Sequence, residues 1–326
     1  MKIHYTLEEK EGILGIIDVW KRKQLTQKVF RDIQWEVGIP PTLIETMFWH
    51  LDTLYQLTKL KPAPIFKGGT CVQCYLPPTL QRASNDLDFN SRTGNPNTII
   101  DQIKELNKKL LKEGKAIELK KHGQKIRYGT LDYNLKDERS GTITFNRRMP
   151  SRLGEYTKTG EYEVMGKNIK IQINYKHAWL PALKIIDKEP RFFILKYQKM
   201  KKNYVYPSSS PEDLIADKIL ATMEEKEGGR ERLKDIYDLM VLLRIKHRKE
   251  KILDKLELIA DRKGNNPTII LKSSSTNISK FVEKDMEAQG FRSLAGIDGK
   301  KIIENWEINC IRLVRTIQEI SEPTPH

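Results

Sequence analysis

The sequence has few cysteines, few histidines and no long apolar run. Its 3 cysteines in 326 residues do not make a disulfide framework. Cys71 and Cys74 have redox or metal-ligand spacing, but no second Cys/His pair matches them, so we interpret them as packed thiols. No stretch approaches the roughly 20 apolar residues of a membrane span, and the acidic residues Glu8, Glu9 and Glu11 argue against a secretory signal. We therefore expect a cytoplasmic protein that does not enter a membrane.

Positive charge is in excess. The chain has 58 lysines and arginines against 43 aspartates and glutamates, which gives a net charge of +15. Such an excess favours a polyanionic partner, usually nucleic acid. The basic runs at 199–202 and 244–249 are candidates for contact with RNA phosphates. The alternative is a solvated basic surface from an organism with lysine- and glutamate-rich proteins.

Three parts of the chain differ in their residue patterns, and a length of 326 residues corresponds to about two domains. Residues 1–60 have helical periodicity and predict an N-terminal helical segment. Residues 61–206 combine period-two apolar runs with a long helix, and predict an α+β core around a mixed sheet. Residues 207–326 start with a linker at 207–211 and predict a C-terminal helical domain, with Ser210 as the N-cap of its first helix.

Within the core, apolar alternation predicts several strands and one helix. The strands are expected at 65–66, 86–89, 126–131, 142–145 and 168–175, and the helix from Asn97 to about Gly114.

The strongest functional pattern is Lys67-Gly68-Gly69-Thr70 followed by Asp86-Leu87-Asp88-Phe89. Two glycines between a strand and a helix start expose backbone N–H groups that can cradle phosphate. Residues two apart on a strand point to the same face, so Asp86 and Asp88 project together and suit a divalent cation with oxygen ligands. Such an ion can bridge nucleotide phosphates during transfer. Taken singly, the glycines are also typical of a plain turn and the aspartates of an exposed strand edge.

Two later helical segments place charged residues among apolar ones. Lys218 follows Leu214 and Ile215 by four and three residues, so it lies on their inward face. A lysine there is unfavourable without a partner, so we predict that it binds nucleotide phosphates; the alternative is a snorkelling side chain. Asp235 and Asp238 share a face of the next helix. Asp235 can position Lys218 or the attacking group, whereas Asp238 can cap or brace a loop.

These segments together resemble the AbiEii-type nucleotidyltransferases of the polymerase-β-like superfamily, which include toxins of type IV toxin–antitoxin pairs and the related MenT enzymes. The similarity covers 66–70 and 84–89 and continues at 216–221 and 232–239. It implies a polymerase-β-like core, an NTP as substrate and Mg²⁺ or Mn²⁺ as cofactor. It also implies an RNA acceptor, with the 3′ end of tRNA as the leading candidate, and a separate antitoxin protein.

The resemblance also implies roles for individual residues. It assigns the metal to Asp86 and Asp88, and assistance in catalysis to Lys218 and Asp235. It assigns the nucleotide phosphates to a larger set: Lys67, Gly68, Gly69, Thr70, Ser84 and Lys218.

One position departs from the superfamily pattern. A third carboxylate usually comes from a later strand, but in the matching strand at 168–175 the same-face residues are Gln172 and Asn174. Either the site holds one metal rather than two, or deprotonation falls elsewhere, or the chain is an inactive descendant. Two other functions stay open: an enzyme that nucleotidylates a protein, and a non-catalytic RNA-binding module that kept the fold.

Overall fold

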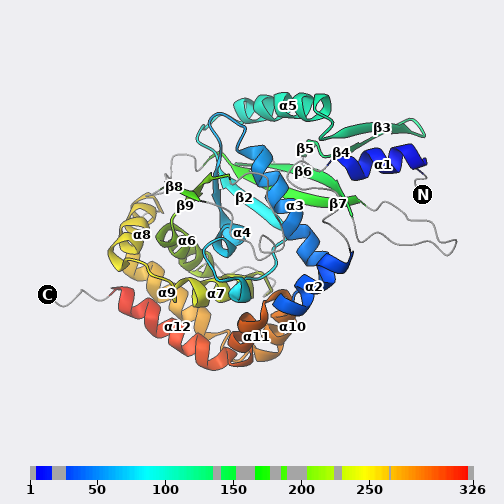
Figure 1. Ribbon diagram of the computed structural model, residues 1–326. Helices are drawn as coiled ribbons and strands as arrows, with labels where there is room; N and C mark the ends of the chain where they lie inside the picture. Colours follow the sequence, from blue (N-terminus) through cyan, green and yellow to red (C-terminus); the bar gives the residue numbers. More distant parts are fainter. Residues whose placement is uncertain are drawn as a thin grey trace.

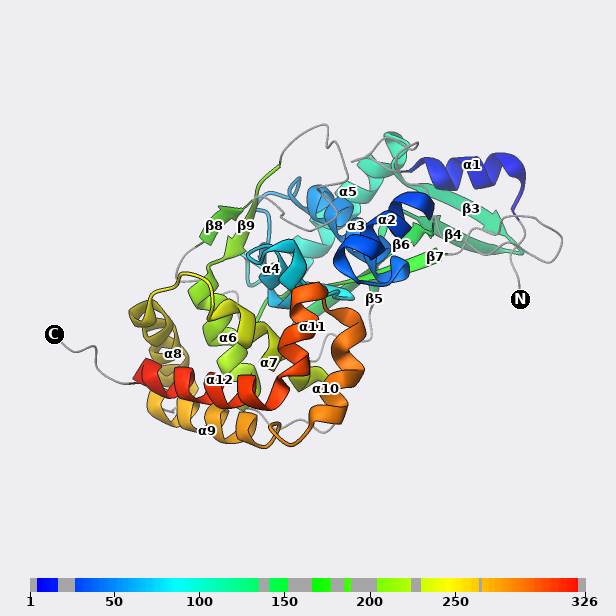
Figure 2. The same cartoon turned by 60° about the horizontal axis from the view of Figure 1, so that its bottom comes forward.

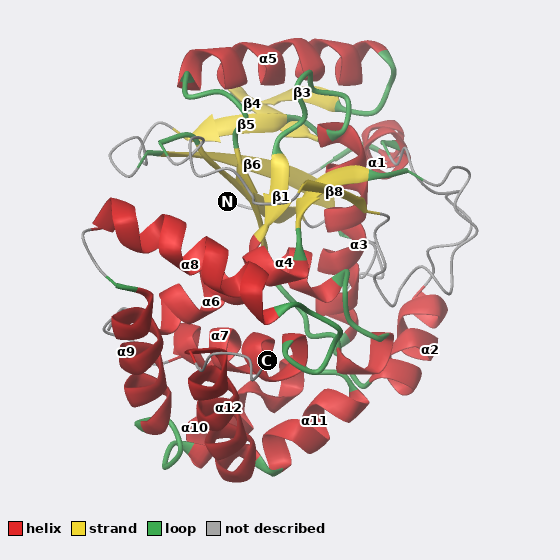
Figure 3. Cartoon of the chain, turned by 90° about the vertical axis from the view of Figure 1, so that its left-hand side faces the viewer, coloured by secondary structure: helices red, strands yellow, loops and turns green. Residues whose placement is uncertain are grey.

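The computed structural model describes residues 5–16, 27–134, 141–151, 166–176, 185–188, 204–223, 230–263 and 266–321. In these residues a mixed sheet lies between the long helix α5 and a large group of helices from the C-terminal part of the chain (Figures 1 and 3). The predicted α+β architecture with a mixed sheet flanked by helices is therefore confirmed.

The main sheet has seven strands in the order β5-β6-β7-β2-β1-β9-β8. Two neighbouring pairs, β2 with β7 and β1 with β9, are parallel, and the other pairs are antiparallel. Its strands are β1 (Ile65–Lys67), β2 (Asp86–Asn90), β5 (Leu131–Asn134), β6 (Thr142–Pro150), β7 (Gly166–Asn174), β8 (Ile185–Lys188) and β9 (Tyr206–Ser209). A separate antiparallel pair consists of β3 (Ile117–Lys121) and β4 (Gln124–Tyr128).

The helices fall into two groups along the chain. The first group is α1 (Leu7–Gly15), α2 (Gln27–Val37), α3 (Pro41–Leu57), the short α4 (Gly68–Gln73) and α5 (Pro96–Lys112). The second group is α6 (Pro211–Met223), α7 (Arg230–Leu242), α8 (Lys249–Lys263), α9 (Pro267–Ser279), α10 (Asp285–Phe291), α11 (Ile297–Glu304) and α12 (Trp306–Ser321). The second group forms a helical layer beside the sheet (Figure 2).

The two faces of the sheet differ in polarity. On β2, Leu87 and Phe89 are buried, whereas Asp86 and Asp88 stay partly exposed on the opposite face. This alternation follows from the period of two in a strand. The apolar face forms the core, and the polar face is left for the functional site.

The apolar face is fastened to two helices by polar contacts. Arg147 of β6 is fully buried and forms an ion pair with Asp52 of α3 at 2.6 Å. Asn107 of α5 both donates to and accepts from the backbone of Leu131, at 2.9 Å each. Helices α3 and α5 are thereby fixed to the strands β6 and β5.

Most of the predicted elements are present, with shifted ends. The run predicted as one strand at 126–131 is split, because Gly129 adopts φ +83° and its backbone passes close to that of Lys115 and Ala116. The helix predicted from Asn97 begins at Pro96, and Asn95 caps it by accepting from the Asn97 N–H at 2.9 Å.

The segment predicted as a linker is wrong in its first part, since Tyr206–Ser209 forms strand β9. Main-chain pairing with β1 and packing of Tyr206 on Phe66, with ring centroids 5.2 Å apart, hold it in the sheet. Ser210 then caps α6 as predicted, because its hydroxyl accepts from the Asp213 N–H at 3.2 Å. The division of the chain at 60 and 206 stays a prediction.

No helix within the described ranges combines the length and apolar character needed to span a membrane.

Candidate active site

The junction of β1 and α4 brings the glycine pair against the acidic pair. Lys67 at the end of β1 is paired with Asp88 of β2 in the antiparallel register. Gly68 then turns the chain with φ +73°, a conformation that glycine adopts without steric cost. A Cβ on Gly68 would lie 2.8 Å from the Cβ of Asp88 and closer still to its carboxylate. Only glycine therefore allows the backbone to approach Asp88 this closely.

The acidic pair lies on the polar face of the sheet, as the alternation predicts. Burial, and then the charge of Asp86, raise the pKa of Asp88 to about 6, while Lys67, Lys218 and Lys170 act in the opposite direction. The two neighbouring carboxylates form a local excess of negative charge, which a divalent cation neutralises. Carboxylate oxygens are also the ligands that Mg²⁺ and Mn²⁺ prefer.

The pair fits one ion better than two. Within the described part of the chain, no group of three or more His, Cys, Asp or Glu side chains converges on a common point. A further oxygen at the pair is the hydroxyl of Ser84, which donates to Asp86 Oδ1 at 3.3 Å. Asp86 and Asp88 would thus supply the protein carboxylates, and other ligands would come from substrate and water.

Thr70 and Ser84 lie at the site but use their hydroxyls within the protein. Thr70 is fully buried, and its hydroxyl donates to the carbonyl of Asp86 at 2.5 Å. This bond ties α4 to the start of β2. Any contact of Thr70 with phosphate would therefore come from its backbone N–H rather than its side chain. Ser84 is 6% exposed, and its hydroxyl donates to a carboxylate oxygen of Asp86.

Lys218 points into this region from α6 and is held by two carboxylates of α7. Its ammonium group forms ion pairs with Asp235 and with Asp238, the latter at 3.0 Å. Burial alone would lower the pKa of Lys218, but Asp238 and Asp235 outweigh it and raise the pKa to about 12. Lys218 is thus a permanent cation, 8% exposed, and the alternative of a side chain that snorkels into solvent does not describe it.

The model of the family described as "Nucleotidyl transferase AbiEii toxin, Type IV TA system" matches residues 52–300 of this chain. The chain belongs to this family. It is therefore a nucleotidyltransferase toxin of the type IV toxin–antitoxin class. The matched range includes every residue of the site described above. A search of curated proteins gave no match.

Two solved structures are similar to this AbiEii-family chain. A nucleotidyltransferase structure from H. pylori is 16% identical, with a TM-score of 0.42, over 92% of this chain and 100% of that one. MenT4, a nucleotidyltransferase toxin from Mycobacterium tuberculosis H37Rv, is 13% identical, with a TM-score of 0.36, over 79% of this chain and 78% of that one.

A buried network behind the AbiEii site was missed by the sequence analysis. Arg82 donates to both carboxylate oxygens of Asp238, at 2.8 and 2.7 Å, and both residues are almost fully buried. Gln73 of α4 accepts from the Arg82 N–H at 2.7 Å and donates to the Gly69 carbonyl at 2.9 Å. Asp238 thus braces the loop before β2, which is the role predicted for it. The same carboxylate also forms the ion pair with Lys218. Its partner Arg82 lies in a loop, so no helix or strand periodicity in the sequence indicates that it is buried.

Two further ionisable residues near the site were also missed. Asp217 of α6 has a raised pKa, because burial outweighs the attraction of Lys67 and Lys255. His50 of α3 is fully buried beside the backbone of Asn85 and the charge of Asp86. Burial lowers the pKa of His50 to about 4, so its ring is neutral at pH 7.

The remaining sequence candidates lie elsewhere or are used in packing. Cys71 and Cys74 are buried and are not joined by a disulfide, which confirms their interpretation as packed thiols. In the basic run at 244–249, Arg244 donates to Asn309 and Lys249 to a carbonyl of α12, so part of its hydrogen bonding is internal. The run at 199–202 lies outside the described residues.

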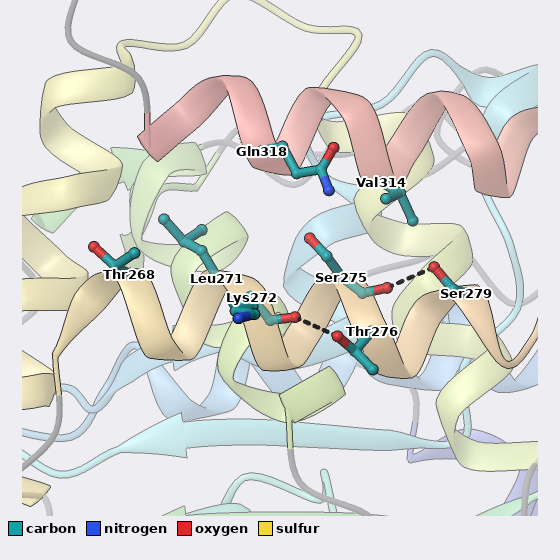
Figure 4. Close-up of a pocket in the computed structure, with 8 residues that line it drawn as sticks. All are labelled: Thr268, Leu271, Lys272, Ser275, Thr276, Ser279, Val314 and Gln318. Carbon is teal, nitrogen blue, oxygen red and sulfur yellow. Dashed lines mark hydrogen bonds between the residues drawn. The ribbon is translucent and has the colours of Figure 1, made fainter.

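The pocket between α9 and α12 has no part in the site (Figure 4). It encloses about 260 Å³. Two of its hydroxyls, on Thr276 and Ser279, donate to backbone carbonyls one turn earlier in α9. Its lining includes none of the candidate site residues: Thr268, Leu271, Lys272, Ser275, Thr276, Ser279, Val314 and Gln318.

Proposed function

We propose that this chain transfers a nucleoside monophosphate from an NTP to RNA and releases pyrophosphate, with the 3′ end of tRNA as the acceptor. Attack by an RNA hydroxyl oxygen on the α-phosphorus forms the new ester bond, and the bond to the pyrophosphate oxygen breaks. The observation that carries this proposal is that Asp88 lies against the backbone of Gly68 and close to the charges of Asp86 and Lys218. As a toxin, it would be opposed by a separate antitoxin protein.

The acidic pair of the site would bind the metal ion, and the basic residues would bind the phosphates. Asp86 and Asp88 would hold Mg²⁺ or Mn²⁺, which would supply positive charge to offset the negative charge that develops during transfer. Lys218 stays positively charged and binds phosphate, since hydrogen bonds between charged groups are stronger than those between neutral groups. Asp235 orients Lys218 and releases it when the triphosphate takes its place. Lys67, the backbone of Gly68 to Thr70 and Ser84 would complete the contacts to the nucleotide.

The missing third carboxylate limits which residue can accept the proton of the attacking hydroxyl. Gln172 lies beside Asp88 in the parallel register, and an amide cannot act as a base. Asp235 is partly exposed, with 18% of its side chain accessible, but it is paired with Lys218 on the side of the triphosphate. We therefore keep for Asp235 the role of holding Lys218, and the proton of the attacking hydroxyl passes to solvent water.

The test is to incubate the protein with each α-labelled NTP, Mg²⁺ and total RNA. We expect one NTP to label RNA. We expect the Asp86→Asn variant to give no labelling, although it still folds and unfolds in a cooperative transition. Asp101→Asn is the matched control, because Asp101 lies exposed on α5 in a pair with Lys104. Label in protein instead of RNA would indicate a protein-nucleotidylating enzyme. RNA binding without any labelling would indicate a non-catalytic relative, and normal turnover by Asp86→Asn would refute the metal site.

A further inference from the structure

The polar face of the sheet continues beyond the acidic pair onto β7 and β6. In the parallel register of β2 and β7, Lys170 lies beside Asp86 and Gln172 beside Asp88. In the antiparallel register of β7 and β6, Asn146 lies beside Lys170. Paired residues on neighbouring strands share a face. A row of polar side chains therefore starts at the acidic pair and runs away from it across two more strands.

Lys170 is the charged member of this row. It is exposed, and its charge lowers the pKa of Asp88. No ion pair joins it to a carboxylate in the part of the chain that the structure describes. Its neighbour Lys167, on the opposite face of β7, donates instead to the Thr42 carbonyl. Lys170 is thus an available cation next to a metal-ligand residue, where a second divalent ion would be repelled.

The acidic pair separates Lys170 from the elements that hold the triphosphate. The glycine junction follows β1, and Lys218 lies in the helix after β9. In the sheet order, β1 and β9 lie on one side of β2, and β7 and β6 lie on the other. In phosphoryl transfer the attacking and leaving oxygens are roughly in line. With pyrophosphate leaving on the β1 side, the attacking hydroxyl must come from the β7 side.

We propose that the β7–β6 row is the acceptor-binding surface, and that Lys170 pairs with a backbone phosphate of a single-stranded RNA end. Gln172 and Asn146 offer amide donors and acceptors to the ribose and base of the terminal nucleotides. A cation at this place attracts the polyanionic acceptor toward the metal site, where carboxylates alone would repel it. This inference rests on the proposed nucleotidyl transfer to RNA.

The test compares Lys170→Met with Lys170→Arg and with Lys120→Met as a matched control. Lys120 is an exposed lysine of β3, in the separate two-stranded sheet. Total tRNA is the acceptor probe, and the affinity of the labelled NTP is measured without acceptor. We expect Lys170→Met to raise the KM for tRNA at least about tenfold, as for loss of one charge-assisted bond. NTP affinity should stay unchanged, and Lys170→Arg should restore most of the tRNA affinity.

Salt dependence gives a second readout. Loss of one phosphate contact should make the slope of log affinity against log salt shallower by about 0.7, the value per contact for a single strand. A wild-type KM and slope in Lys170→Met would overturn the inference and leave nucleotidyl transfer intact. Weakened NTP binding with an unchanged KM for tRNA would place Lys170 on the donor side and also overturn it. Failure of the wild-type protein to label any RNA would instead refute the proposed function.

Discussion

Replacing Gly68 by alanine tests whether the β1–α4 junction positions the metal-binding carboxylates. A Cβ at residue 68 would lie 2.8 Å from the Cβ of Asp88, whereas carbon atoms pack at about 3.5 Å or more. Asp88 or the junction must therefore move by about 0.7 Å. Because a misplacement of about 1 Å can lower a rate about 100-fold, we expect transfer by Gly68→Ala to fall by about ten- to a hundredfold.

The backbone cost of this substitution can be separated from the displacement of Asp88. Gly123, in the turn between β3 and β4, has φ +76°, close to the +73° of Gly68, but a Cβ there would meet nothing within 4 Å. Gly123→Ala should therefore lose about 1–2 kcal/mol of unfolding free energy, measured with urea, and keep its full transfer rate. If Gly68→Ala transfers label at the rate of Gly123→Ala, the close approach at Gly68 does not position the site.

Two other substitutions test the buried charges. Lys218→Met keeps the apolar stem, so we expect a folded protein whose NTP affinity or transfer rate falls at least about tenfold; wild-type values would make Lys218 purely structural. Asp238→Asn leaves Arg82 and Lys218 without their shared carboxylate, and we expect urea unfolding to show a loss of about 3–5 kcal/mol. Burial opposes ionisation of Asp238, but Arg82 and Lys218 outweigh it and lower its pKa in the folded state. Its stabilisation is therefore complete above about pH 4 and is lost as the pH falls through the folded pKa. The unfolding free energy of Asp238→Asn should depend less on pH below about pH 4 than that of the wild type, and equal slopes would contradict this assignment.

Residues whose positions depend on local periodicity were predictable from the sequence. The alternation in Asp86-Leu87-Asp88-Phe89 is enough to put both carboxylates on the polar face, because a strand has a period of two. The spacing of Lys218 from Leu214 and Ile215 likewise put its ammonium on the inward face of α6. Each of these predictions needed only the geometry of one element.

Residues whose roles depend on long-range pairing were not predictable. Arg82 meets Asp238 across 156 positions of sequence, and no pattern near either residue specifies the other. Strand β9 was interpreted as a linker because its serines and proline have low strand propensity. Its place in the sheet comes from main-chain pairing with β1 and from the packing of Tyr206 on Phe66, and both contacts are with a strand far away in the sequence.

Lys170 falls between these two cases. Its parity with Gln172 and Asn174 was visible in the sequence, so its face could have been predicted. Its place beside Asp86 required the register of β2 and β7, which a single sequence does not give.

The most direct test of the account is to measure pyrophosphate and labelled RNA in the same reaction. We predict that the wild-type protein, with Mg²⁺ and its preferred NTP, releases one pyrophosphate for each nucleotide that enters RNA. Asp86→Asn should form neither product, whereas the control Asp101→Asn should form both at the wild-type rate. Equal yields of both products from Asp86→Asn would contradict the assignment of the acidic pair, and wild-type pyrophosphate release without labelled RNA would contradict an RNA acceptor.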